Sequence, residues 1–159
     1  MPKRSAGLLV YRQRAVSVEV FLVHPGGPFW KKKDLGAWSI PKGQYIEDED
    51  PLSAARREFQ EETGFPAPAG AAPLGELTQA SGKIVVGWAA EGDYDPEKLV
   101  SNPCQVEWPP RSGRRIDIPE IDRAAWFSLE EARVRILKSQ QPFLDRLVKL
   151  LLNAEEPPH

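Results

Sequence analysis

Three glutamates, Glu58, Glu61 and Glu62, are spaced so that one helix would bring their carboxylates together. Residues four apart share a face of an α-helix, and residues three apart are neighbours on it. Crowded carboxylates repel one another and destabilise a fold unless a cation or basic groups lie among them. Hard cations such as Mg²⁺ take oxygen ligands, usually a few carboxylates with water and substrate phosphates. The triplet therefore indicates a divalent-cation site, although an isolated acidic cluster on a helix is more often a solvated surface.

The residues around the triplet predict the helix that carries it. Asp50 before Pro51 is typical of an N-cap and a first helical residue, and Gly64 is typical of the position just past a C-terminus. About three and a half helical turns lie between these signals. The opposite face carries residues that can pack on a core, namely Leu52, Ala55 and Phe59.

Arg57 directly precedes the first glutamate of the triplet. A guanidinium cannot bind a metal ion, but it can hold a carboxylate in place from behind through hydrogen bonds. Glu49 or one of the helix glutamates is the expected partner. We therefore include Arg57 among the candidate catalytic residues, as a group that positions others.

Taken together, residues 43–65 resemble the Nudix box. Nine specified positions over 23 residues match it: Gly43, Glu49, Arg57, Glu58, Phe59, Glu61, Glu62, Gly64 and Phe65. The resemblance implies the Nudix fold, an α/β/α sandwich with a mixed β-sheet, over essentially the whole chain. We therefore expect a single Nudix hydrolase domain over residues 1–159, with residues 154–159 as a frayed tail.

The resemblance also implies a metal-dependent reaction at a pyrophosphate bond. It assigns the metal, Mg²⁺ or Mn²⁺, to Glu58, Glu61, Glu62 and the carbonyl of Gly43. Metal ions neutralise phosphate charge and acidify a water molecule, and one carboxylate would take the proton from that water. Glu58 and Glu62 are the leading candidates for this base. Glu120, at the start of the last expected strand, is the alternative from a loop.

Basic residues near the box bear on the substrate. Lys42 gives the sequence Pro-Lys-Gly, which members acting on dinucleoside polyphosphates or diphosphoinositol polyphosphates often carry. Nucleoside-triphosphate pyrophosphatases more often have Pro-Gly-Gly. A lysine at this position adds a cation where a longer phosphate chain must be held. Lys32, Lys33 and Arg114 are further candidates for substrate contact, and a solvated loop is an equally supported interpretation of each.

The leading hypothesis is a hydrolase resembling diadenosine tetraphosphate hydrolases. A nucleoside-triphosphate, sugar-nucleotide, ADP-ribose or diphosphoinositol polyphosphate pyrophosphatase is the alternative among enzymes. A catalytically silent, nucleotide-sensing Nudix module is the alternative outside them, and the intact box argues against it. Four aromatic residues are candidates for stacking on a base, and their spacing does not select among them: Trp30, Tyr45, Trp88 and Trp108. Trp38 is expected to be a core residue.

The composition fits one soluble domain of 159 residues, of which 41% are hydrophobic and 28% charged. The net charge of -2 gives no reason to expect nucleic-acid or membrane-surface binding, and no apolar run is long enough to span a bilayer. A single cysteine, Cys104, excludes an intramolecular disulfide and fits a cytoplasmic location. We expect a monomer or homodimer whose partner is a small-molecule nucleotide or polyphosphate.

Short apolar runs predict the strands. They cover residues 5–11, 18–24, 37–40, 74–80, 83–90 and 124–127. Residues 12–17 would connect the first two runs as a hairpin. In the second run, alternation predicts one face in the core and a partly covered opposite face.

The remaining elements are predicted near the C-terminus and in one long loop. A helix should begin at Ser128, which forms a capping box with Glu131, stop at Pro142 and resume over residues 143–152. Residues 92–119 are the least regular part and are expected to be largely loop. Within them we expect a helical turn at 95–99 and strand-like pieces at 105–108 and 116–118.

Overall fold

The fold is built on a mixed six-stranded β-sheet, and the computed structural model describes residues 3–15 and 17–155. The sheet contains β1 (Arg4–Arg14), β2 (Ser17–Pro25), β3 (Lys42–Gln44), β4 (Ala72–Thr78), β5 (Ile84–Glu91) and β8 (Ile121–Ser128). Its order is β4-β5-β1-β2-β8, with β3 beside β1. The β1 strand runs parallel to β5 and antiparallel to β2. The expected strands 74–80, 83–90 and 124–127 correspond to β4, β5 and β8.

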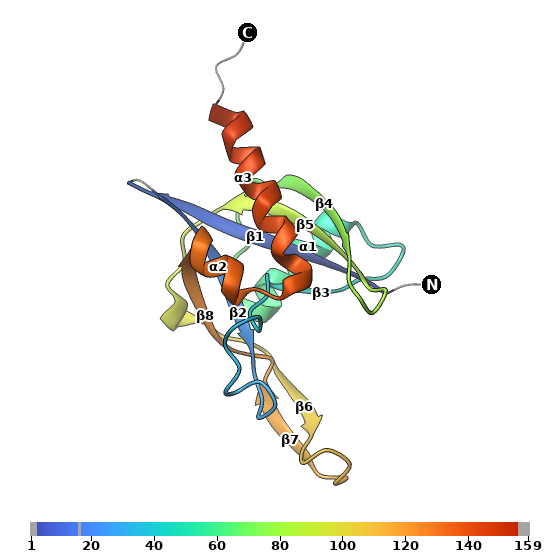
Figure 1. Ribbon diagram of the computed structural model, residues 1–159. Coiled ribbons are helices and arrows are strands. Elements are labelled where there is room, and N and C mark those ends of the chain that lie inside the picture. The colour runs from blue at the N-terminus through green and yellow to red at the C-terminus, as the bar shows by residue number, and fades with distance from the viewer. Residues whose placement is uncertain (1–2, 16, 156–159) are drawn as a thin grey trace.

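Helices cover both faces of this sheet (Figure 1). They are α1 (Pro51–Thr63), α2 (Leu129–Arg135) and α3 (Gln141–Glu155), with 3₁₀ turns η1 (Pro96–Lys98) and η2 (Lys138–Gln140). One core cluster joins α1 to the sheet, and a second joins α2 and α3 to the other face. The predicted α/β/α sandwich with a mixed sheet is confirmed.

The β2 strand shows why both faces are apolar. Phe21 and Val23 belong to the cluster on the α1 side, whereas Val20 and Leu22 belong to the cluster on the α3 side. All four are at most 1% exposed. The prediction of a partly covered second face is therefore wrong, because a helical layer on each side buries both.

The connection between β1 and β2 is shorter than expected. Both strands continue past the apolar runs, and Arg14 pairs with Ser17 in the antiparallel register. Part of the predicted hairpin, residue 16, lies outside the described residues.

The box helix α1 begins and ends as predicted. The Asp50 side chain accepts a hydrogen bond from the backbone N–H of Ser53 at 3.0 Å, so it is the N-cap. Gly64 follows the helix in the left-handed conformation, and its N–H donates to the carbonyl of Gln60 at 2.8 Å. Phe59 is fully buried on the sheet, which leaves the opposite side of α1 free to carry the acids.

The helical region after Ser128 breaks earlier than expected. Ser128 is the N-cap of α2, as predicted, but α2 ends at Arg135 and η2 intervenes. Pro142 lies in the first turn of α3 instead of interrupting a helix, and proline is well tolerated there because those N–H groups need no partner within the helix. The α3 helix continues through Glu155, so residues 154–155 of the predicted tail are helical. Residues 156–159 lie outside the described part.

The break before α3 supports the segment that leads into the box. Residues 37–40 form isolated bridges, Val23 with Ser39 and Trp38 with Ile136, instead of the predicted strand. The buried side chain of Gln140 accepts from the N–H of Ile40 at 3.0 Å and donates to the Ser39 hydroxyl at 3.0 Å. These contacts fix the chain just before Gly43. The Trp38 side chain is 4% exposed, so its predicted place in the core is confirmed.

Residues 92–119 contain three short regular elements, the first of which is η1, where a helical turn was predicted. The two strand-like pieces pair with each other as a separate antiparallel hairpin, β6 (Pro103–Glu107) with β7 (Arg115–Pro119). The hairpin projects from the end of the sandwich, at the bottom of Figure 1. Its two ends lie together, because Pro103 pairs with Pro119 and the N–H of Glu120 donates to the carbonyl of Asn102 at 2.9 Å.

None of the helices in residues 3–15 and 17–155 is long and apolar enough to cross a membrane.

Candidate active site

Arg57 links the acidic residues on the outer side of α1. Its Nε and Nη2 atoms donate to Glu49 Oε2 at 3.0 and 2.8 Å, and its Nη1 donates to Glu58 Oε1 at 3.0 Å. The same Nη1 lies 3.5 Å from Glu61 Oε1, one turn further along the helix. One guanidinium therefore contacts three carboxylates, including both kinds of partner expected from the sequence, and restricts their orientations.

Glu58 lies directly against Gly43 in β3. A Cβ atom built on Gly43 would be 2.0 Å from the carboxyl carbon of Glu58, so any larger residue would displace that carboxylate. Burial, and then the nearby charge of Glu61, raise the pKa of Glu58 above its ordinary value. The absence of a side chain at Gly43 thus brings the box backbone and a helix carboxylate to one place, where both can supply oxygen ligands.

Glu62 is the most buried of the box acids, with 7% exposure. Its Oε2 atom accepts a hydrogen bond from the backbone N–H of Lys42 at 3.2 Å. Burial, and then the charge of Glu120, raise the pKa of Glu62 to about 8. A lone ionised carboxylate in this position is costly, so a nearby cation would stabilise it.

The loop between β7 and β8 brings Glu120 to the same place. Its backbone carbonyl accepts from the N–H of Gly26 at 3.0 Å, and its N–H donates to Asn102. A Cβ atom at Gly26 would lie 2.0 Å from the carbonyl oxygen of Pro119, so this approach of the two loops requires glycine. The close contact fixes the backbone on which Glu120 is carried.

Lys42, Glu62 and Glu120 line one cavity of about 250 Å³, and Trp30 forms part of its wall. Burial lowers the pKa of Lys42, an effect that the charge of Glu62 opposes. Burial, and then the charge of Glu61, raise the pKa of Glu120. The shifts all oppose the charged forms, and loss of hydration is the first cause of each.

The acids fit a divalent cation by charge and donor chemistry without forming a finished cage. Among the described residues, no three Asp, Glu, His or Cys side chains converge closely enough to hold a metal ion. The carboxylates are directed to protein donors instead, Glu58 to Arg57 and Glu62 to the backbone of Lys42. Oxygen ligands with raised pKa values are nevertheless what a hard cation stabilises. The metal roles assigned to the box residues stay predictions.

Three other predicted substrate residues lie apart from this cavity. Lys32 and Lys33 are exposed in the loop that follows β2 and do not line the cavity. The Nζ atom of Lys33 lies 3.6 Å from the ring centroid of Phe29, and its carbonyl contacts Nε2 of the buried His24. Arg114 is exposed in the turn of the β6–β7 hairpin. Their roles in substrate binding stay predictions.

The four aromatic candidates separate into two pairs. Tyr45 and Trp88 pack against the core cluster on the α1 side. Trp30 and Trp108 line a second cavity, of about 380 Å³, between the loop that follows β2 and the β6–β7 hairpin. The structure therefore brings two tryptophans from distant parts of the sequence to one place, and leaves the other two aromatic residues partly buried against the core.

The second cavity is the feature that sequence reasoning missed. Cys104 lies half-buried in its wall on β6, and burial raises the pKa of this thiol. Alternating residues in 103–107 and 115–119, on either side of Gly113, are the sequence pattern that indicates this hairpin. The prolines in the same segment favour an irregular loop instead.

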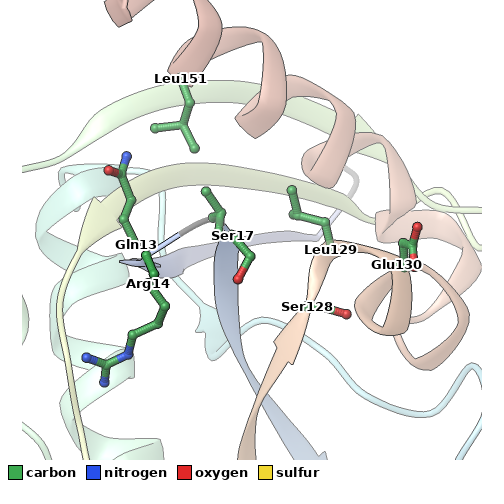
Figure 2. A pocket seen from close by; sticks show the side chains of 9 residues that line it. Gln13, Arg14, Ser17, Ser128, Leu129, Glu130 and Leu151 are labelled. Atoms are coloured by element: carbon green, nitrogen blue, oxygen red, sulfur yellow. The ribbon is translucent and has the colours of Figure 1, made fainter.

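A larger cavity, of about 860 Å³, lies elsewhere. Figure 2 shows Gln13 and Ser17 of the β1–β2 hairpin on one side, Leu129 at the start of α2 on the other, and Leu151 of α3 above them. None of the box residues lines this cavity. Its size therefore does not make it the catalytic site.

Several solved structures share this fold. Structures with the same fold include a C. elegans Ap4A hydrolase in a binary complex (22% identity, TM-score 0.65, covering 94% of this chain and 98% of that one). The NUDIX domain of Shewanella oneidensis NrtR, complexed with ADP ribose, is similar at 16% identity and a TM-score of 0.63, covering 95% and 89%. A mutT/nudix family protein from Listeria innocua is similar at 16% identity and a TM-score of 0.64, covering 97% of each chain. No curated protein sequence matches.

The family model for the NUDIX domain matches residues 1–150. This match covers the box, the whole sheet and α1, and it supports the predicted pyrophosphohydrolase activity. The chain belongs to the Nudix family.

Proposed function

We propose that this protein hydrolyses a pyrophosphate bond in a dinucleoside polyphosphate, such as diadenosine tetraphosphate, with Mg²⁺ or Mn²⁺ as cofactor. The expected products are a mononucleotide and a nucleoside triphosphate. The fold shared with the C. elegans Ap4A hydrolase supports the proposal at the level of architecture.

The observation that carries the substrate proposal is the position of Lys42. Its side chain lines the cavity that also contains Glu62 and Glu120, immediately before the box glycine. A substrate with a long phosphate chain carries more negative charge than a divalent cation neutralises, and a lysine beside that cation supplies the remaining positive charge. Burial lowers the pKa of Lys42, so an anionic substrate would also stabilise its charged form.

The box residues have distinct proposed roles. The carboxylates of Glu58, Glu61 and Glu62, with the carbonyl of Gly43, would hold the cation, which lowers the charge on the phosphates and the pKa of an attacking water. Arg57 keeps Glu58 and Glu61 oriented through the contacts described above.

Proton removal from the attacking water is proposed for Glu58, Glu62 or Glu120. All three lie in the region of Lys42, and each has a raised pKa, as a general base operating near neutral pH requires. Separate replacement of each by glutamine distinguishes them. The base is the residue whose loss still lowers kcat at saturating Mg²⁺, because a higher metal concentration offsets the loss of a group that only holds the cation.

A substrate panel tests the proposal. Diadenosine tetraphosphate, ATP, ADP-ribose and a diphosphoinositol phosphate are compared by kcat/KM with Mg²⁺ and with Mn²⁺. We expect diadenosine tetraphosphate to rank first, and Lys42→Ala to reduce that preference by about tenfold because it removes a charged contact. If diadenosine tetraphosphate ranks far below the others, the substrate proposal is wrong.

The enzyme and sensor alternatives are separated by Glu61→Gln. An enzyme loses turnover in this variant, whereas a nucleotide sensor binds nucleotide without measurable turnover in either form. The matched control is Glu47→Gln, which makes the same chemical change at an exposed residue outside the box positions.

A further inference from the structure

The cavity between the β6–β7 hairpin and the loop after β2 has apolar and aromatic walls. Phe29, Trp30 and Trp108 supply the rings, and Val106 and Ile118 on the two hairpin strands supply aliphatic surface. Its volume of about 380 Å³ lies within the range of small-molecule sites.

This cavity adjoins the proposed catalytic cavity. Pro25, Trp30 and Glu120 line both. A molecule whose phosphates lie beside Lys42 and Glu62 would therefore reach the aromatic walls with the group attached to those phosphates. The two cavities differ in character. The catalytic cavity alone contains Lys42 and Glu62, and the other alone contains Phe29 and Trp108.

The second cavity suits a neutral group better than the phosphate chain. Its lining residues, all within the described part of the chain, include the carboxylates of Glu107 and Glu120 but no lysine or arginine. A neutral, flat group with hydrogen-bond donors fits this lining better than an anion does. Aromatic side chains bind the faces of nucleobases in a sequence-tolerant way, which matches these walls.

We propose that this cavity binds a nucleobase of the substrate, stacked against Trp108, with Trp30 as the adjoining wall. The proposal rests on the proposed function for the phosphate side only. The exposed wall is held in place before any ligand binds. Phe29 is 57% exposed, yet its ring packs edge-on against Trp30 with centroids 5.1 Å apart and is covered by the Nζ atom of Lys33. An ordered wall reduces the entropy that binding must offset.

The test compares two ligands that differ only in the base. AMP and ribose 5-phosphate carry the same sugar phosphate, and neither contains a pyrophosphate bond to hydrolyse. Calorimetric titration in Mg²⁺ should show that the wild-type protein binds AMP about 10- to 100-fold more tightly, because each stacked base contributes that much in single-stranded nucleic-acid complexes. Equal binding of the two ligands would overturn the proposal.

Variants locate the base. Trp108→Ala should reduce the preference for AMP to below about threefold, and Trp108→Phe should retain most of it because a ring remains. The matched control is Gln105→Ala on the same hairpin, at an exposed position that does not line the cavity, and it should keep the full preference. An unchanged AMP preference in Trp108→Ala would place the base elsewhere and refute the assignment.

A second measurement does not depend on the folding of a variant. In the wild-type protein, the indole N–H NMR signals of Trp30 and Trp108 should shift on addition of AMP but not of ribose 5-phosphate, while that of Trp88 should not move. AMP binding with these signals, in a protein that hydrolyses nothing on the substrate panel, would support the base site and reject the proposed function. Hydrolysis of nucleotides without any such shift would do the reverse.

Discussion

The box end of the molecule and the β6–β7 hairpin are built by opposite means. The box acids lie on a capped helix whose other side is buried in the sandwich, and Glu62 itself is 7% exposed. The hairpin is a two-stranded sheet outside the main sheet, with mostly exposed or half-buried residues and an exposed basic turn. The box end holds charged side chains in fixed positions, and the hairpin adds a partly exposed surface beside them.

This difference separates the proposed chemistry from the proposed recognition. Metal-assisted hydrolysis depends on carboxylates held to within a fraction of an ångström, so it suits residues fixed by a core. Recognition of a neutral base depends on area and shape, which a projecting hairpin supplies without disturbing the core. Substitutions in the first region should therefore change kcat, and those in the second should change KM.

The largest effect is expected from Glu58→Gln. The change removes a charge from the carboxylate that contacts both Arg57 and the backbone of Gly43. We expect kcat to fall by about 10²- to 10⁴-fold, the range for loss of a group that acts in the chemical step. Steady-state kinetics on the best substrate of the panel measure it, with Glu47→Gln as the control that keeps wild-type activity.

The next effect is expected from Gly43→Ala. The added Cβ would lie 2.0 Å from the Glu58 carboxyl carbon, so the carboxylate must move. A displacement of about 1 Å in a catalytic group can lower the rate by about 100-fold. The control is Gly70→Ala, where a Cβ meets nothing within 4 Å. Wild-type kcat in Gly43→Ala would show that the contact between Gly43 and Glu58 is not needed.

A pH effect on stability is expected from Glu62. Its folded-state pKa of about 8 lies above its ordinary value of 4.5, so the folded protein binds the proton more strongly than the unfolded chain does. Metal-free protein should therefore be most stable near pH 5 and lose on the order of 2 kcal/mol as the pH rises to 8. Denaturant titrations at several pH values with a chelator measure this loss.

Two comparisons check the source of that pH dependence. In Glu62→Gln, the free energy of unfolding should change less between pH 5 and 8, because position 62 no longer carries a carboxyl that ionises. Mg²⁺ should restore stability at pH 8 in the wild-type protein but less in the variant, since a ligand that binds the folded state stabilises it. A steep profile in Glu62→Gln would assign the effect to other groups.

A smaller effect is expected from Arg57→Ala. Arg57 positions Glu58 and Glu61 without itself binding the cation, and loss of a group that orients metal ligands typically costs about 10- to 100-fold in metal affinity or activity. We expect the lower end, about tenfold, because the arginine is partly exposed. Titration of activity with Mg²⁺ should show a higher metal requirement. Arg56→Ala, one residue earlier on α1, is the control.

The smallest effect is expected from Arg114→Ala in the hairpin turn. An exposed arginine gains little from a charged partner in water, so KM for diadenosine tetraphosphate should rise by about two- to threefold. The change should disappear at 0.5 M salt, where surface charges are screened. A change in kcat would show that the hairpin takes part in the chemistry and would remove the distinction between the two regions.

The box end was largely predictable because its signals are local. Asp50, Pro51 and Gly64 define a helix within one stretch of sequence, and the glutamates follow from helical spacing. The partner of Arg57 could also be named, since Glu49 is only eight residues away. The sandwich itself followed from the resemblance that this stretch carries.

The rest depends on contacts between distant residues, which no local pattern encodes. Gln140 supports Ile40 across a hundred residues of sequence, so local signals put the break at Pro142 instead of after Arg135. The same is true of Trp30 and Trp108, which line one cavity beside the place where Gly26 lies against Pro119. The strand predicted at 37–40 failed for a related reason, since its backbone partners come from both β2 and the end of α2.

The joined ends of the β6–β7 hairpin have a consequence for how this protein can change. Asn102 and Glu120 are hydrogen-bonded across its base, so hairpins of other lengths and sequences can be grafted there without altering the separation of the flanking segments. Such a graft would replace the walls of the proposed base cavity and leave the capped helix that carries the box acids unchanged.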